Sequence, residues 1–276
     1  MWFCKLKRCL GRFLLIFSIV AIVSCANSSQ ISIEEAQYAI DHHDWDQAIY
    51  LAKSVLESDP SNIKAALVLA AAYAGKGGFR VVDLAEVIAN DIHRGRIMGA
   101  LHNAMLMIGS VDMEQIRNAI YYLLERVNPF PQFGHLHFID YQFDVGLLLV
   151  IEGHVLPTII AQPLLDGPID VNQITQEIAD RVQQDLVNFD NYLLNAGFTE
   201  DDDILVHSRE TYCVLENASG RTDGFDLEVL RDLTLCQLSP NNGADLGPDD
   251  FQSGKVTACT DFNYDACSSV DTSDTE

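Results

Sequence analysis

A repeat with a spacing of 34 residues is the feature that most limits how the first half of this chain can fold. Ala36 recurs as Ala70 and Ala104, and the residues around each alanine align with decreasing fidelity along the chain. A period of this length is typical of stacked helical hairpins, because each unit buries its apolar face only against its neighbours. We therefore predict an all-α fold that begins with a short helical-hairpin array over residues 31–130.

Helix-start and helix-stop residues divide the repeat into individual helices. The first three predicted helices are Ile33–His42, Trp45–Ser58 and Asn62–Ala74, separated by His43-Asp44, Asp59-Pro60 and the turn Gly75–Gly78. Pro60 ends a helix because proline lacks an amide hydrogen and clashes with the preceding turn. The second helix of the middle unit is predicted over Arg80–Ile92, and the third unit repeats the Asp44 pattern at Asp112.

These units resemble the tetratricopeptide repeat family. Leu69-Ala70 and Tyr73 stand where that family has Leu-Gly and Tyr, and Pro60 stands at its helix-ending proline. The chain departs from the family's pattern at Ala66, which replaces a Trp, and at Ala52, which replaces an aromatic residue. The resemblance implies antiparallel helix pairs that approach closely through small residues, and a concave face that binds extended or helical peptides.

The resemblance also implies which residues line the concave face. Carried over position by position, they are Ile33, Gln37, Ile40, Lys64, Leu67, Ala71, Ala74, Met98, Leu101, Met105 and Ile108. Only Gln37 and Lys64 among them are polar, so the face suits an apolar partner, to which flexible methionines can adapt. We expect this partner to be internal, because Tyr141–Ile160 is apolar enough to fill the face and an open apolar groove favours aggregation. An external partner is the alternative.

Residues 1–24 have the composition of a lipoprotein signal peptide. Basic residues precede the apolar run Phe13–Val23, which is shorter than the roughly 20 residues of a membrane-spanning helix. The tetrapeptide Ile22-Val23-Ser24-Cys25 resembles a bacterial lipobox, which implies that Cys25 carries the lipid and begins the mature protein. Residues 25–30 would then form a tether. An ordinary cleaved signal with an unrelated cysteine is the alternative.

The net charge of the chain excludes nucleic acid as a partner, and the lipoprotein signal predicts where the protein is located. The chain has 17 basic and 40 acidic residues, and a net charge of -23 would repel the phosphates of a nucleic acid. Ala26, not Asp, follows the lipobox cysteine, which favours the outer membrane over retention at the inner membrane. We therefore expect a protein held at a bacterial outer membrane by its lipid anchor (palmitate and related acyl chains) and facing the periplasm.

Four cysteines in the last third of the chain are expected to form disulfides: Cys213, Cys236, Cys259 and Cys267. Exported thiols usually pair, and the absence of a C-x-x-C spacing makes a zinc site the weaker alternative. Four cysteines allow three connectivities. Pairing of neighbours, Cys213 with Cys236 and Cys259 with Cys267, is predicted only because it closes the shortest loops.

Beyond residue 130 the repeat fades, and a helical extension is predicted over residues 131–238. Tyr141–Ile160 is expected to form a buried helix broken at Pro157, because its polar residues would be costly in a bilayer. Further helices are predicted over Val171–Ala196, from Asp201-Asp202-Asp203 to Glu216, and over Leu227–Leu238. Residues 239–276 are acidic and rich in Asn, Gly, Asp and Ser, so they are expected to form a loop-rich tail held by its cysteines.

Few residues suggest chemistry, and we expect neither an enzyme nor a bound cofactor or metal. His135, His137 and Asp140, with Asp144 nearby, form one candidate metal site in the helical extension, but such groups more often have structural roles. His42-His43-Asp44 is a second candidate of the same kind. The Asp261-x-Asn263-x-Asp265 sequence lacks the Gly and the Glu that a calcium loop requires.

Two classes of function follow from these observations. The favoured one is a lipid-anchored periplasmic adaptor or assembly factor that binds other envelope proteins. The alternatives are a metal-dependent enzyme with its site in the helical extension, or a partner of a periplasmic solute transporter.

Overall fold

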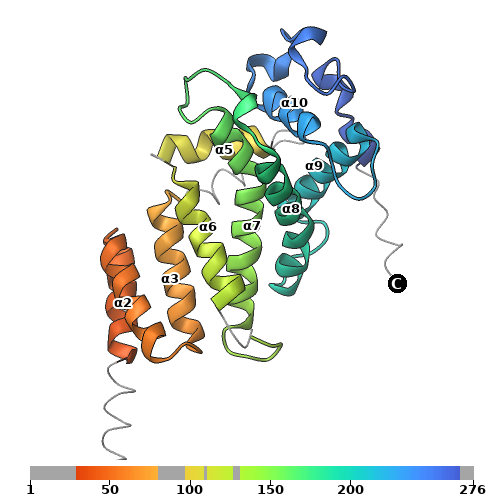
Figure 1. The fold of residues 1–276 in the computed structure, drawn as a ribbon. Coiled ribbons are helices and arrows are strands. Elements are labelled where there is room, and N and C mark those ends of the chain that lie inside the picture. The colour runs from red at the N-terminus through yellow and green to blue at the C-terminus, as the bar shows by residue number, and fades with distance from the viewer. Residues whose placement is uncertain (1–28, 80–96, 109–110, 127–130, 268–276) are drawn as a thin grey trace, which may run out of the picture.

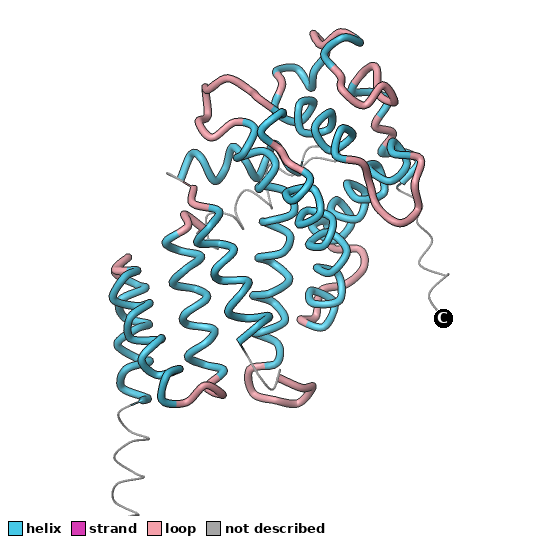
Figure 2. Tube along the Cα trace, in the orientation of Figure 1, coloured by secondary structure: helices cyan, strands magenta, loops and turns pink. Residues whose placement is uncertain are grey.

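The computed structural model describes residues 29–79, 97–108, 111–126 and 131–267. This part of the chain contains helices, turns and loops but no strand, which confirms the all-α prediction (Figure 2). The expectations for the signal peptide, for the lipidated Cys25 and for the helix Arg80–Ile92 concern residues outside the described ranges.

The helices follow one another in the order drawn in Figure 1. An N-terminal group comprises the helix over residues 29–41, α2 (Trp45–Ser58), α3 (Ile63–Lys76), α5 (Ile97–Ile108) and α6 (Met113–Tyr121), which ends in a π-helical turn (Tyr122–Arg126). A second group comprises α7 (Phe138–Ala161), α8 (Gln176–Asn195), α9 (Asp203–Ser219) and α10 (Leu227–Leu238). The remaining short elements are α11 (Tyr264–Cys267) and four 3-10 turns, Val171–Gln173, Pro240–Gly243, Pro248–Asp250 and Cys259–Asp261.

Helices α2 and α3 form a close pair, and local signals explain where each begins. The backbone N–H of Ala65 donates to the Asn62 side chain over 3.0 Å at the start of α3. Gly75 allows the two helices to approach, because a Cβ at this position would lie 2.5 Å from the ring of Trp45. The indole therefore rests directly on the backbone of the neighbouring helix.

Helix α7 lies at the centre of the molecule and packs against α3, α5, α6, α8 and α10 (Figure 1). It is long and apolar enough to span a membrane, yet 83% of its most apolar stretch is buried within the protein. Gly146 lets α8 approach closely, since a Cβ there would lie 2.7 Å from Leu193. The predicted break at Pro157 is wrong: α7 continues through the proline to Ala161, because packing on the surrounding helices outweighs one missing backbone hydrogen bond.

Two disulfides tie the C-terminal segment to α9 and α10. They join Cys213 to Cys267 and Cys236 to Cys259, with Cα–Cα distances of 5.8 and 5.6 Å. The prediction that all four cysteines pair is confirmed, whereas the pairing of neighbours is wrong. The chain after α10 folds back over α10 and then reaches α9, so each helix meets a later cysteine. Which cysteines pair is therefore decided by which ones lie close together in the folded chain. Loop length matters less, because the entropy of loop closure grows only slowly with loop length.

Candidate functional site: a groove beside helix α7

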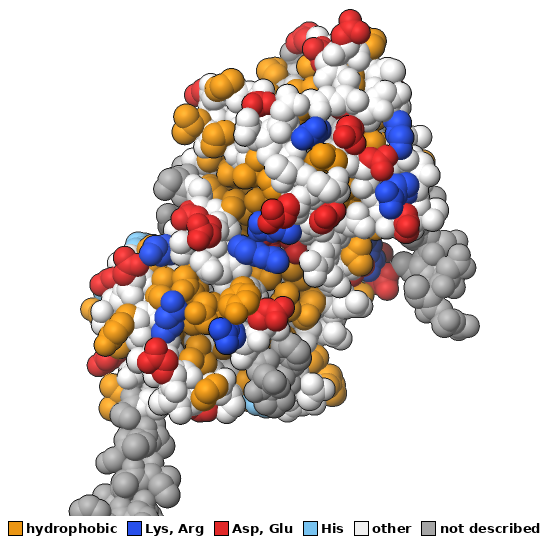
Figure 3. All heavy atoms as spheres, viewed as in Figure 1, with side chains coloured by type: hydrophobic (Ala, Val, Ile, Leu, Met, Phe, Trp, Pro, Cys, Tyr) orange, Lys and Arg blue, Asp and Glu red, His pale blue; other side chains and the backbone are white. Residues whose placement is uncertain are grey.

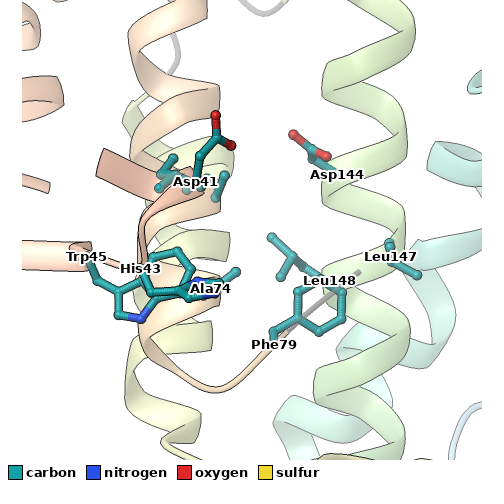
Figure 4. Close-up of a pocket in the computed structure, with 12 residues that line it drawn as sticks. Asp41, His43, Trp45, Ala74, Phe79, Asp144, Leu147 and Leu148 are labelled. Carbon is teal, nitrogen blue, oxygen red and sulfur yellow. The ribbon is translucent and has the colours of Figure 1, made fainter. Parts of the chain in front are cut away.

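A groove lies between the helix over residues 29–41 and α3 on one side and α7 on the other (Figure 4). It consists of a large cavity of about 830 Å³ and a small cavity of about 380 Å³. Ile40, Asp41, Ala71 and Asp144 line both, so the two cavities adjoin. The small cavity is also lined by His43, Trp45, Ala70, Ala74, Gly75, Phe79, Leu147 and Leu148. The large cavity is also lined by Gln37, Lys64, Leu67, Val68, His137, Ile139, Asp140, Phe143 and Ala196.

The structure separates the predicted concave-face residues into two sets. Six of them line the groove: Gln37, Ile40, Lys64, Leu67, Ala71 and Ala74. Four are buried in the core instead, each at most 2% exposed: Ile33, Met98, Leu101 and Met105. Three of these buried residues belong to α5, which packs against α7. The side chain of Ile108 lies outside the described part. Helix α7 therefore covers the face at α5 and leaves it open between the helix over residues 29–41 and α3.

Two carboxyl groups lie on opposite walls where the cavities adjoin. In Figure 4, Asp41 and Asp144 extend into the gap between the helix over residues 29–41 and α7. Neither side chain forms an ion pair or a hydrogen bond with another described residue. Burial, and then the charge of Asp140, raises the pKa of the Asp144 carboxyl to about 7. The groove thus combines apolar walls with two carboxyl groups that form no ion pair with any described residue.

The candidate metal site in the helical extension is only partly assembled. His137, Asp140 and Asp144 line the large cavity, whereas His135 does not. His137 Nδ1 lies 3.5 Å from Asp140 Oδ2, and the backbone N–H of His137 donates to the His135 ring over 3.1 Å. Within the described ranges, no three His, Cys, Asp or Glu side chains are grouped so that they could hold a metal ion.

The second candidate, His42-His43-Asp44, forms a turn between two helices. His42 Nδ1 donates to the backbone carbonyl of Tyr38 over 2.8 Å, and Asp44 accepts from the N–H of Gln47 at the start of α2. His43 adopts a φ of 59°, in the left-handed region, and lines the small cavity. Two of the three residues therefore have turn and cap roles, and only His43 reaches the groove.

A buried ion cluster on another face of α7 was not predicted from the sequence. Glu152 is fully buried and accepts hydrogen bonds from Arg117 of α6, at 3.1 Å, and from Arg181 of α8. Arg117 also lies 4.0 Å from Asp185, whose pKa is raised by burial and then by the charge of Glu152. Basic and acidic side chains adjoin across the middle of the face in Figure 3. This cluster joins α6, α7 and α8 through ion pairs.

Several groove residues were also missed, for different reasons. Asp41 lies four residues after Gln37, on the same helix face, so the spacing of the concave-face positions contained the signal for it. Leu147, Leu148 and Asp144 reach the groove only because α7 packs opposite the first hairpin. No local pattern in the sequence specifies that long-range contact.

No protein-family model matches the chain, and no curated protein or solved structure matches it either. Its function is therefore argued from the lining residues: apolar walls, two facing carboxyl groups, and an opening in the surface between three helices.

Proposed function

We propose that this protein acts by binding: it holds a peptide segment of another cell-envelope protein in the groove and catalyses no reaction. The observation that carries the proposal is the pair of adjoining cavities, about 830 and 380 Å³, walled by apolar side chains of three helices. Grooves of this kind commonly bind a helical or extended segment through a few apolar anchor residues. Six lining residues occupy positions that the resemblance to tetratricopeptide repeats assigns to peptide binding.

The proposal extends to the repeat family and to the location of the protein. Small residues at the helix contacts, Ala48, Ala52 and Gly75, support reading the first hairpins as tetratricopeptide-like. We further propose that Cys25 carries a lipid and anchors the chain to a bacterial outer membrane, with the groove in the periplasm. Two disulfides are consistent with export to an oxidising compartment. The partner would then belong to envelope assembly or to a solute transporter.

Site-specific photocrosslinking tests the binding function. Ile139 lines the large cavity and is 61% exposed, so a photoreactive residue in its place should crosslink to whatever enters the groove in native envelopes. Ala71→Trp fills the junction of the two cavities and should abolish the adduct. Ala244→Trp, at an exposed alanine of the C-terminal segment, should leave it intact. An adduct that persists unchanged in Ala71→Trp would place the binding surface elsewhere.

The lipid anchor is tested separately. Cys25→Ser should yield an uncleaved or soluble protein in fractionated cells, because the acyl chains provide the membrane affinity. A Cys25→Ser protein that remains in the membrane at its normal mature size would refute the lipoprotein interpretation and would leave the groove proposal intact.

A further inference from the structure

The junction of the two cavities has an unusual combination of shape and charge. Asp41 and Asp144 are the only Asp, Glu, Lys or Arg residues among the described residues that line the small cavity, and both also line the large one. Figure 4 shows their carboxyl groups on opposite sides of the gap, with Trp45 and Phe79 lower in the same view. Anything that passes from one cavity to the other therefore lies between two carboxyl groups.

No positive side chain of the described part neutralises this junction. Lys64 lines the large cavity and forms no ion pair with a described residue. His137 is also in the large cavity and lies beside Asp140, at 3.5 Å, instead of beside the junction carboxylates. His43 is the remaining titratable neighbour, on the wall of the small cavity. Among the described residues, these two carboxyl groups thus lie beside apolar walls with no cation within ion-pair distance; Asp41 is exposed to solvent and Asp144 is half-buried.

We propose that the groove selects peptide segments that place a lysine or arginine between Asp41 and Asp144 and an adjacent apolar side chain in the small cavity. This inference rests on the proposed peptide-binding function and specifies the chemistry of the peptide. The cation forms ion pairs with both carboxylates. The neighbouring apolar side chain packs against Trp45, Phe79 and Leu148.

Other peptide chemistries fit the junction less well. An acidic segment would meet two carboxylates on a chain whose net charge is -23. A wholly apolar segment would strip water from both carboxyl groups and offer no hydrogen-bond donor in return, which is costly. A lysine or arginine offers donors and the opposite charge, while its aliphatic stem can lie along Ile40 and Ala71.

The electrostatics of Asp144 agree with this assignment. Burial, and then the charge of the neighbouring Asp140, raises the pKa of the Asp144 carboxyl to about 7, and no described cation lies close enough to stabilise the ionised form. A bound lysine or arginine supplies that missing charge and lowers the pKa again.

Selection from a random peptide library displayed on phage, with the purified full-length chain as bait, tests the inference. Enriched peptides should share one basic position next to an aliphatic or aromatic position. Enrichment of peptides without a basic position would overturn the inference and leave the peptide-binding function standing. Enrichment of no peptide, with the chain folded by circular dichroism, would count against both.

Matched variants then assign the basic position to the junction. Replacing the basic residue of a selected peptide by Gln should weaken binding about tenfold to the native chain and much less to Asp144→Asn or Asp41→Asn. Glu35→Gln is the control: it removes one negative charge from an exposed position outside the groove, on the helix over residues 29–41 that also carries Asp41. This variant should still bind the basic peptide about tenfold more tightly than the Gln peptide. Equal losses in all four proteins would place the basic residue away from the two aspartates and overturn the inference.

Discussion

Asp41 and Asp144, in the groove between the first hairpin (residues 29–79) and α7, differ from Asp226 and Asp232 of the C-terminal region (residues 203–267) in whether their carboxyl groups have partners in the described part of the chain. In the C-terminal region, Asp232 is fully buried and accepts backbone N–H groups of Gln252 and Ser253 at 2.7 and 3.0 Å. Asp226 there is held by Lys255 and Arg221. At the groove, Asp41 and Asp144 have no such partners among the described residues.

The same two regions are also held together by different means. The C-terminal region has two disulfides, while the first hairpin relies on close packing, such as the Trp45 ring against Gly75. In the C-terminal region, Asp226 and Asp232 have hydrogen-bond or ion-pair partners and two disulfides cross-link the chain. At the groove, Asp41 and Asp144 have no partner among the described residues and the helices leave cavities between them, so there is room for a ligand. This contrast supports the proposal that the groove, and not the C-terminal region, is the binding surface.

Removing a disulfide should have the largest effect and should leave the groove unaffected. The Cys213–Cys267 bridge spans a sequence separation of 54 residues, so loop-closure entropy assigns it about 4 kcal/mol of stability. Cys213→Ala with Cys267→Ala should lower the free energy of unfolding in urea by this amount while peptide affinity stays unchanged. Removing Cys236–Cys259, with its separation of 23 residues, should cost less, about 3 kcal/mol. A large loss of peptide affinity in either variant would show that peptide binding at the groove depends on the C-terminal disulfides.

A substitution at Gly75 should affect stability and binding together. Gly75→Ala places a methyl group against the Trp45 ring and forces α2 and α3 apart, at a cost of about 3 kcal/mol. Because both residues line the small cavity, peptide affinity should fall as well. Gly247→Ala is the control, since its nearest non-local atom to a new Cβ is 3.8 Å away. Unchanged stability in Gly75→Ala, measured by urea unfolding, would contradict the close approach.

Local signals predicted much of the helical structure. The bounds Trp45–Ser58 and Leu227–Leu238 agree with α2 and α10, because periodic apolar residues are followed by clear stop signals. The helix break predicted at Pro157 was wrong. A proline ends a helix less readily where the helix is held by packing, and α7 is buried against several helices. The disulfide pairing also failed, because it depends on where the chain folds back.

The candidate site was predictable on one wall only. The resemblance to tetratricopeptide repeats implied that Gln37, Lys64 and Ala71 share one face, and all three line the groove. The opposite wall is α7, whose register against the hairpin is set by its contacts with α5, α6 and α8. Those contacts join residues far apart in the chain, so Asp144 could not be assigned to the same junction as Asp41 from the sequence.

Replacing an aspartate by asparagine should raise the free energy of unfolding at the groove, at Asp144, and lower it in the C-terminal region, at Asp232. The pKa of Asp144 in the folded chain, about 7, exceeds its ordinary value of 3.8. The folded state therefore keeps a proton that the unfolded state has lost, and stability falls as the pH rises through this window. A shift of this size corresponds to about 4 kcal/mol, and since Asp144 is only half-buried we expect solvent to screen about half of it. Asp144→Asn should therefore stabilise the protein by about 2 kcal/mol near pH 8 and change little near pH 4.

Asp232→Asn is the matched substitution in the C-terminal region. It removes charge-assisted hydrogen bonds to two backbone N–H groups and should destabilise the protein by about 2 kcal/mol near pH 8. Urea unfolding at both pH values measures each effect. Destabilisation by both substitutions near pH 8 would show that Asp144 is as well satisfied as Asp232 and would remove the contrast.

The smallest expected effect is a pH dependence of binding that only the groove should show. A basic peptide pairs with the ionised form of Asp144, whose fraction falls roughly tenfold between about pH 8 and pH 6 for a pKa near 7. The affinity of a lysine-containing peptide, measured by calorimetry, should therefore fall up to about tenfold over this range. Asp41, Asp140, His43, His137 and Lys64 are the other titratable groups that line the groove. Asp144→Asn separates the contributions, because any pH dependence that persists in this variant arises from other groups. A native chain that binds the peptide equally at both pH values would show that Asp144 does not contact the cation, even if the groove is the binding site.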